Sequence, residues 1–207
     1  MITQVTGVLL AGGRSRRMGV DKRFLQVGDK TLLERALEVY DQVFEEILVI
    51  AAARTTDLAA IRHRILIDVI PDCGSLGGLY TGLSGATGER VFAAACDMPF
   101  LNPAVIAHLV SLSPESDIVM PKLSMGLQPM HAVYAKTCLP HVRRMLDAGR
   151  LTIHEITQNA SLTVRFVPED ELQRIDSKLL SFLNLNTPAD LEFARKLAAQ
   201  QNTPTAS

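Results

Sequence analysis

The chain has 207 residues, of which 47% are hydrophobic, enough for one domain with a sizeable core. Its formal net charge of −1 argues against broad electrostatic binding to nucleic acid or to a membrane surface, so we expect neither as a partner. Its cysteines, Cys73, Cys96 and Cys138, are odd in number and lack C-x-x-C spacing, which indicates reduced thiols. Because no signal peptide or membrane-spanning apolar run is evident, we expect a cytoplasmic protein.

Apolar strand-like runs alternate with helical patterns over the first two-thirds of the chain, which is typical of an α/β domain with a mostly parallel sheet. In chain order, the expected strands are Val5–Leu10, Ile47–Ala52, Leu66–Ile70, Val91–Cys96, Ile118–Met120, Met130–Tyr134 and Leu162–Val167. Helices are expected from Thr31, over Leu79–Gly85, from Asn102-Pro103, over two segments of 137–158 and after Thr187. We predict one three-layer α/β/α, Rossmann-like domain over 1–199 and a disordered polar tail over 200–207.

Two of these helices carry clear start signals. Thr31 and Glu34 form a capping box, and Gly28-Asp29 predicts a chain reversal just before it. The residues at helical spacing that should face the core of this first helix are Leu33, Ala36, Leu37, Tyr40, Val43 and Phe44. Thr187-Pro188-Ala189-Asp190 is expected to cap the last helix, with its apolar residues Leu191, Ala194 and Leu197 facing inward.

The segment after the first strand is rich in glycine and cations. The apolar run Val8–Leu10 leads into Ala11, Gly12 and Gly13, and three arginines, a glycine and Lys22 follow. Glycines let a backbone approach a ligand closely, and exposed N–H groups beside clustered cations attract an anion such as a triphosphate. The spacing fits neither the dinucleotide fingerprint nor the P-loop. The segment is therefore predicted to bind phosphates in another way.

Two aspartates follow predicted strands, where open α/β sheets bind their ligands. Asp97 comes directly after an apolar strand, and we predict that it is a Mg²⁺ ligand, because Mg²⁺ takes one or two protein carboxylates and completes its shell with phosphates and water. Cys96 should point the other way, as a small core residue. Asp72 is a second candidate, in a glycine-containing segment. A turn or helix-cap role remains the alternative for both aspartates.

Four separated motifs resemble one family. Leu9 to Lys22 resembles the L-A-G-G-x-S-x-R-M-G-x-D-K loop of small nucleotidyltransferases, and its A-G-G form with the later D-K resembles the molybdenum cofactor guanylyltransferases, which are MobA-like nucleotidyltransferases. The Cys96-to-Pro99 stretch resembles the family's C-D-x-P motif, and Gln128 to Tyr134 its Q-P-L-H-A-V-Y motif. The Phe182-to-Leu191 stretch matches its F-x-N-x-N-T-P-x-[DE]-L motif. The motifs occur in the family's order.

The resemblance implies an activity and a set of site residues. It implies a Mg²⁺-dependent transfer of GMP from GTP to Mo-molybdopterin, giving the guanine dinucleotide cofactor and pyrophosphate. Nucleotide-binding roles are implied for Leu10, Ala11, Gly12, Gly13, Lys22, Asp72 and Asp97. Catalytic roles are implied for Lys22, Arg17 and Asp97, with Arg16 as an alternative to Arg17, and a role beside the metal or the substrate phosphate for Asn184 and Asn186.

Other readings stay open. Ala51 stands where some family members carry an asparagine that holds the nucleotide, so the base is not fixed, and a molybdopterin cytidylyltransferase or a sugar- or lactate-phosphate transferase is the near alternative. A non-catalytic nucleotide-binding protein and a Rossmann oxidoreductase are more distant. Asn186 is also an ordinary helix-start residue. His131 is expected to be an interior histidine, since an ionised phosphate attacks without a general base. Transient contact with molybdenum cofactor enzymes or upstream synthesis proteins is a further expectation.

Overall fold

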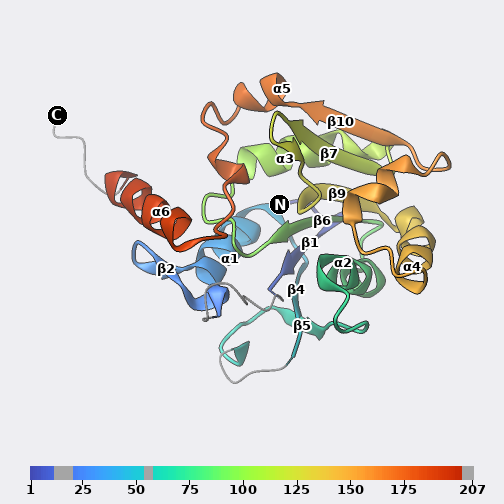
Figure 1. The fold of residues 1–207 in the computed structure, drawn as a ribbon, viewed down its shortest axis with the longest axis horizontal. Coiled ribbons are helices and arrows are strands. Elements are labelled where there is room, and N and C mark those ends of the chain that lie inside the picture. Colours follow the sequence, from blue (N-terminus) through green and yellow to red (C-terminus); the bar gives the residue numbers. More distant parts are fainter. Residues whose placement is uncertain (12–20, 54–57, 202–207) are drawn as a thin grey trace.

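The computed structural model describes residues 1–11, 21–53 and 58–201, and within them a mixed sheet forms the middle layer (Figure 1). The strand order is β10-β7-β9-β6-β1-β4-β5, and the short β8 pairs with β7 outside this path. The strands are β1 Val5–Leu10, β4 Ile47–Ala51, β5 Arg64–Ile67, β6 Arg90–Ala95, β7 Ile118–Leu123, β8 Gly126–Leu127, β9 His131–Ala135 and β10 Val164–Pro168. Pairing is parallel except for β9, which runs antiparallel to β6 and β7, and for β8. The predicted mostly parallel sheet is confirmed.

Helices cover both faces of this sheet, which confirms the three-layer arrangement. On one face lie α1 Leu32–Val43, α3 Pro103–Ser111 and α5 Glu169–Gln173, and on the other α2 Gly74–Gly85 and α4 Leu139–Asp147. All six residues of β1 are buried, with Leu9 in one core and Val8 in the other. A strand covered on both faces needs apolar side chains in succession, which is why the run was recognisable.

The glycines of α2 bring this helix close to the sheet. The segment Leu79–Gly85 was expected to belong to a helix, which is confirmed, and the helix starts at Gly74. A Cβ on Gly78 would lie 2.7 Å from Leu10 Cδ2, and one on Gly82 would lie 2.6 Å from Val8 Cγ1. Glycine costs helix stability, yet here it allows the helix to approach the sheet closely.

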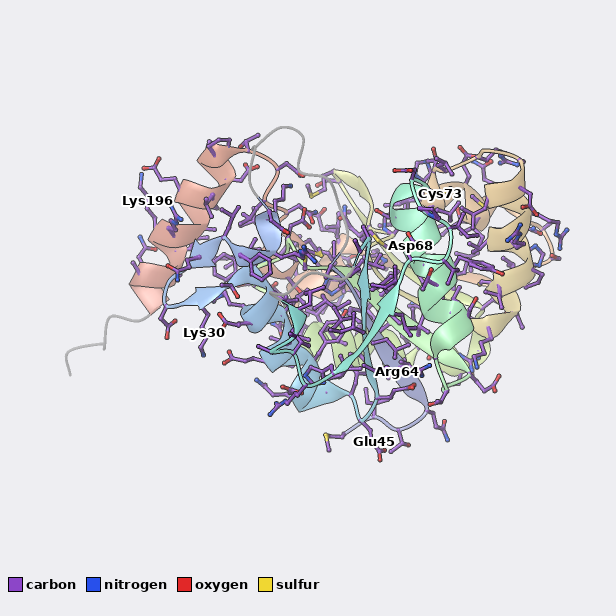
Figure 2. All side chains as sticks on the ribbon, turned by 90° about the horizontal axis from the view of Figure 1, so that it is seen from below. Lys30, Glu45, Arg64, Asp68, Cys73 and Lys196 are labelled. Atoms are coloured by element: carbon purple, nitrogen blue, oxygen red, sulfur yellow. The ribbon has the colours of Figure 1, made fainter. Side chains whose placement is uncertain are left out.

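The third strand ends earlier than predicted because a side chain turns the chain. Asp68 Oδ1 accepts hydrogen bonds from Ile70 N at 3.1 Å and from Thr81 Oγ1 at 2.9 Å. The strand therefore stops at Ile67 rather than Ile70, and the loop from Asp68 to Cys73 enters α2 (Figure 2). The second predicted helix of 137–158 is the 3₁₀ segment Ile153–Gln158.

A small third core joins the two ends of the chain. The hairpin of β2 Gln26–Val27 and β3 Lys30–Thr31 packs against α6 Pro188–Gln201, as Figure 1 shows. Its buried residues are Val27, Leu32, Leu185, Leu191, Ala194 and Ala198. Because α6 reaches Gln201, positions 200 and 201 of the expected tail are helical, and 202–207 lie outside the described residues. The described helices include none with the length and apolarity that crossing a membrane requires.

Candidate active site

The site lies where the strand order reverses. β1 has β4 on one side and β6 on the other, and the chain leaves the carboxyl ends of β1 and β6 side by side. Cys96 N donates to Leu10 O at 3.1 Å, and Ala11 N donates to Ile50 O at 2.8 Å. Such a reversal point opens a crevice for ligands in parallel sheets. Leu10 and Ala11 stand at the end of β1, with side chains buried in the two cores.

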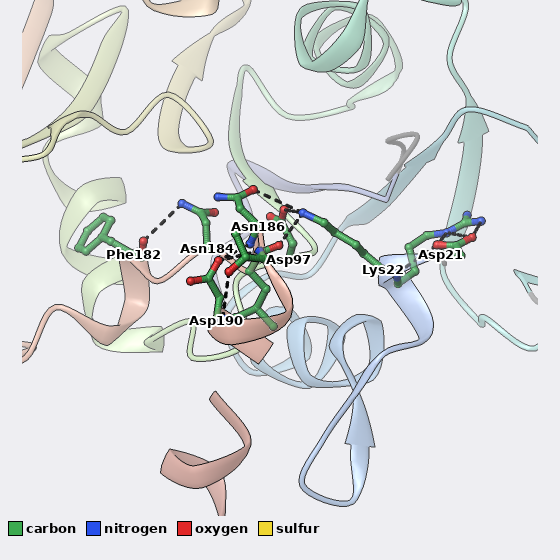
Figure 3. Close-up of polar contacts among 10 residues, drawn as sticks. Asp21, Lys22, Asp97, Phe182, Asn184, Asn186 and Asp190 are labelled. Atoms are coloured by element: carbon green, nitrogen blue, oxygen red, sulfur yellow. Dashed lines mark hydrogen bonds and ion pairs between the residues drawn. The ribbon is translucent and has the colours of Figure 1, made fainter. Parts of the chain in front are cut away.

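Lys22 and Asp97 meet beyond the carboxyl ends of β1 and β6 (Figure 3). Lys22 Nζ lies 3.3 Å from Asp97 Oδ2, and both side chains are about one-fifth exposed, at 19% and 21%. The same ammonium donates to the Leu185 carbonyl oxygen at 2.5 Å and to Asn186 Oδ1 at 3.4 Å. A cation thus sits among three oxygen acceptors from distant parts of the chain. We call Lys22, Asp97, Leu185 and Asn186 the lysine cluster.

Asp21 starts the short helix that carries Lys22. Its side chain caps the 3₁₀ turn Lys22–Phe24 by accepting from Arg23 N at 3.1 Å, and it also accepts from the Arg23 guanidinium. These hydrogen bonds, the Arg23 side chain foremost, lower the pKa of Asp21 despite its partial burial. Asp21 therefore stays charged and holds the turn in place, with Lys22 directed toward Asp97 (Figure 3).

The segment before α6 is fixed by its own hydrogen bonds. Leu185 N donates to Asp97 O at 3.0 Å, which joins this segment to the loop after β6. Asp190 Oδ2 accepts from Asn186 N at 2.9 Å and from Thr187 N at 2.7 Å, and these bonds, that of Asn186 first, lower the pKa of Asp190. Thr187 Oγ1 accepts from Asp190 N in return, as in a capping box. The cap thereby sets the backbone that meets Lys22.

The structure brings together only part of the predicted site. Asn186 joins the lysine cluster, whereas Asn184 Nδ2 donates to Phe182 O at 3.4 Å. Asp72 is exposed, with a left-handed φ of 63°, at the turn into α2, and none of its described contacts reaches the lysine cluster. The predicted residues Gly12, Gly13, Arg16 and Arg17 lie outside the described residues.

Two further predictions concern buried residues. Cys96 is in the core, and burial raises its pKa to about 12, so its thiol is not a nucleophile, as expected. Ala51 is also buried, at the end of β4, where it offers no side-chain hydrogen bond. The role of the Leu185 main-chain carbonyl was missed, because every residue has such a carbonyl and the sequence does not show which one is used. Asp190 was recognised only as a helix cap.

The oxygen atoms of the lysine cluster are of the chemical kind that Mg²⁺ binds. Asp97 is a partly exposed carboxylate that already faces a cation, and its neighbours offer carbonyl and amide oxygens. Mg²⁺ prefers oxygen ligands and needs few carboxylates when phosphates complete its shell. In the described ranges, no three His, Cys, Asp or Glu residues are grouped to hold a metal, so Asp97 would act with the substrate's phosphates.

Comparison with known proteins agrees with this geometry. The model of the MobA-like NTP transferase domain matches residues 7–162. The chain belongs to this family. It is 34% identical to a probable molybdenum cofactor guanylyltransferase of Pelotomaculum thermopropionicum, over 97% of this chain and 96% of that one. A molybdenum cofactor guanylyltransferase of Desulfosudis oleivorans is 36% identical, over 92% and 94%.

Solved structures share the fold. The molybdopterin-guanine dinucleotide biosynthesis protein A of Archaeoglobus fulgidus superposes with a TM-score of 0.84 at 26% identity, covering 95% of this chain and all, 100%, of that one. The family assignment therefore rests on both sequence and architecture. Family members are nucleotidyltransferases, which matches a lysine held among oxygen acceptors at the strand reversal.

Proposed function

We propose that this chain is a molybdenum cofactor guanylyltransferase, which transfers GMP from GTP to the phosphate of Mo-molybdopterin and releases pyrophosphate. One observation carries the proposal: Lys22 Nζ lies 3.3 Å from Asp97 Oδ2 at the β1–β6 reversal, in a chain with guanylyltransferase relatives of nearly equal length. This pair supports the proposal because it brings together one cation and one anion, the charges that a triphosphate and its metal ion need.

Lys22 supplies positive charge to the triphosphate. Its ammonium is held by the Leu185 carbonyl and by Asn186, so it is oriented before substrate binds. Fixed charge of this kind stabilises the negative charge that develops on a transferring phosphoryl group and its leaving group. The acceptor phosphate attacks the α-phosphorus in line, the bond to the β-phosphate oxygen breaks, and pyrophosphate leaves.

No side chain has to remove a proton in this reaction. A phosphate is already ionised at neutral pH, so it attacks directly. His131, the histidine of the Q-P-x-H-A motif, is fully buried, and burial lowers its pKa to about 3. It stays neutral inside the protein, consistent with an interior role.

Asp97 would hold Mg²⁺, with Asn186 beside it. Bound there, the ion would neutralise charge on the triphosphate. Leu10 and Ala11 would contribute the edge of the nucleotide site, and Asp72 would contact the nucleotide from the turn into α2. We further propose a cytoplasmic location, where free thiols remain reduced, and transient contact with the proteins that supply and receive the cofactor.

The direct test is turnover with purified acceptor. The chain is incubated with Mg²⁺, Mo-molybdopterin and each ribonucleoside triphosphate in turn, and pyrophosphate and the dinucleotide product are measured. We expect product with GTP only. Product with CTP alone would instead identify a cytidylyltransferase, and no product with any triphosphate would refute transferase activity on this acceptor.

A further inference from the structure

His131 is a buried titratable residue that has no role in the proposed reaction. It begins β9, pairs in register with Ala94 of β6, and is 0% exposed. Neither ring nitrogen makes a hydrogen bond of normal geometry with any described residue. Burial lowers the pKa of His131, and the nearby backbone of Ser181 partly opposes this fall. A buried polar group without a full partner reduces stability, so packing alone gives no reason for a histidine here.

The ring contacts connect β6 to the segment that carries the lysine cluster. His131 meets the ring of Phe92 at a right angle, with centroids 5.2 Å apart, and the ring of Phe182 at 4.6 Å. Phe92 belongs to β6, three residues before its end. Phe182 ends the 3₁₀ turn Leu180–Phe182, from which the chain continues to Asn186. The imidazole therefore lies between the sheet and this turn.

The turn itself is anchored to the loop that follows Asp97. Ser181 Oγ accepts from Asn102 N at 3.0 Å, and Ser181 N donates to Asp176 Oδ2 at 2.8 Å. Three residues beyond Phe182, the amide of Leu185 donates to the carbonyl of Asp97. A shift of Phe182 would thus be passed to the Leu185 carbonyl and to Asn186, the two acceptors that orient Lys22.

We propose that His131 is a positioning residue, which sets the Phe182–Asn186 segment and through it the ammonium of Lys22. The inference deepens the proposed function and rests on it for its kinetic part. The flat imidazole fills the space between two phenyl rings and keeps a nitrogen near the Ser181 backbone. Displacements of about 1 Å at a reacting group cost as much as a hundredfold in rate.

The test is His131→Leu, with Val133→Ala as the matched control. Val133 is the next residue of β9 on the same core face, where it lies opposite Phe92 of β6, and its truncation opens that core without removing the imidazole. For His131→Leu we expect an unchanged or higher melting temperature, because two unsatisfied nitrogens are removed. We also expect kcat to fall about tenfold, with a smaller change in KM for GTP. Val133→Ala should lower the melting temperature and keep kcat.

Amide hydrogen exchange supplies a readout that does not depend on activity. In His131→Leu the Leu185 amide should exchange faster, while amides in the middle of β6 keep their rates. Unchanged exchange at Leu185, or a kcat within about twofold of the original, would overturn the positioning role. If the unaltered chain fails to transfer GMP, the proposed function is wrong, and faster exchange at Leu185 would still support the positioning role. Should His131→Leu fail to fold, Phe182→Leu is measured in the same way: we expect the same fall in kcat and faster exchange at Leu185, with a lower melting temperature because a buried ring is lost.

Discussion

Lys22 Nζ lies 3.3 Å from Asp97 Oδ2, although the two residues are 75 positions apart in the chain. The contact joins the segment after β1 to the loop after β6, the two strands that flank the reversal of strand order. Its partly exposed ion pair contributes little to stability. Its importance is in the proposed function, because it brings a cation and a carboxylate together where we propose that phosphates bind.

Replacement of Lys22 should separate activity from stability. We expect Lys22→Ala to lower kcat by about 10²–10³-fold, because a fixed charge on the phosphates is lost. The free energy of unfolding should change by about 1 kcal/mol or less, because the pair keeps contact with solvent. Lys30→Ala is the control, since Lys30 of β3 forms an ion pair with Glu38 of α1 outside the lysine cluster (Lys30 is labelled in Figure 2). Equal losses of activity in both variants would contradict the role of Lys22.

The activity should require a divalent metal ion, and this requirement should depend on Asp97. Removal of divalent ions with a chelator is expected to abolish turnover, and added Mg²⁺ to restore it. Asp97→Asn should need more Mg²⁺ for half-maximal activity and reach a lower kcat, because a neutral amide binds Mg²⁺ weakly. Circular dichroism should show an intact fold. Asp29→Asn, at the exposed hairpin turn, serves as control. Turnover of Asp97→Asn with the original Mg²⁺ requirement would remove Asp97 from the metal site.

Asp190 and Glu34 allow a matched comparison of two helix caps. Both carboxylates accept backbone hydrogen bonds in capping boxes, at α6 and α1. Asp190→Asn and Glu34→Gln should lower the melting temperature to a similar extent. Only Asp190→Asn should also lower kcat, because Asp190 fixes the backbone of Asn186 in the lysine cluster. If the two variants retain the same activity, the α6 cap is structural only.

Stability at acid pH should depend on Asp117. Hydrogen bonds from Thr137, the strongest influence, and from Thr163 lower the pKa of Asp117. A lowered pKa in the folded state gives stability that is present above the unfolded value of about 3.9 and is lost as pH falls through the folded value. Denaturant midpoints measured from about pH 6 downward should therefore drop less steeply for Asp117→Asn. An unchanged acid slope would contradict this assignment.

The sequence predicts best what is local or continuous. Val5–Leu10 was predicted with its observed bounds, because a strand buried on both faces is an unbroken apolar run. The Thr31–Glu34 capping box was confirmed because its partners are three residues apart. The end of the third strand was misjudged because it depends on a hydrogen bond from Thr81, 13 residues further on.

The charged residues of the candidate site were predicted from the sequence, but the groups that hold them in place were not. Lys22 and Asp97 stand out by charge beside apolar strands, and the structure joins them. The Leu185 carbonyl has no sequence signal, and the two asparagines, equivalent by spacing, separate: Asn186 contacts Lys22 and Asn184 does not. His131 was expected to be a satisfied interior residue, but its nitrogens have no normal hydrogen bond with the described residues.

The small core between the β2–β3 hairpin and α6 has a consequence for biosynthesis on the ribosome. Residues that pack there come from both ends of the chain, Val27 from the hairpin and Ala194 from α6. A nascent polypeptide can build the central strands long before it is finished, but Lys22 lacks two acceptors until position 186 has left the exit tunnel. On the proposed function, catalysis therefore has to wait until the Leu185–Asn186 segment has been synthesised and has docked beside Lys22.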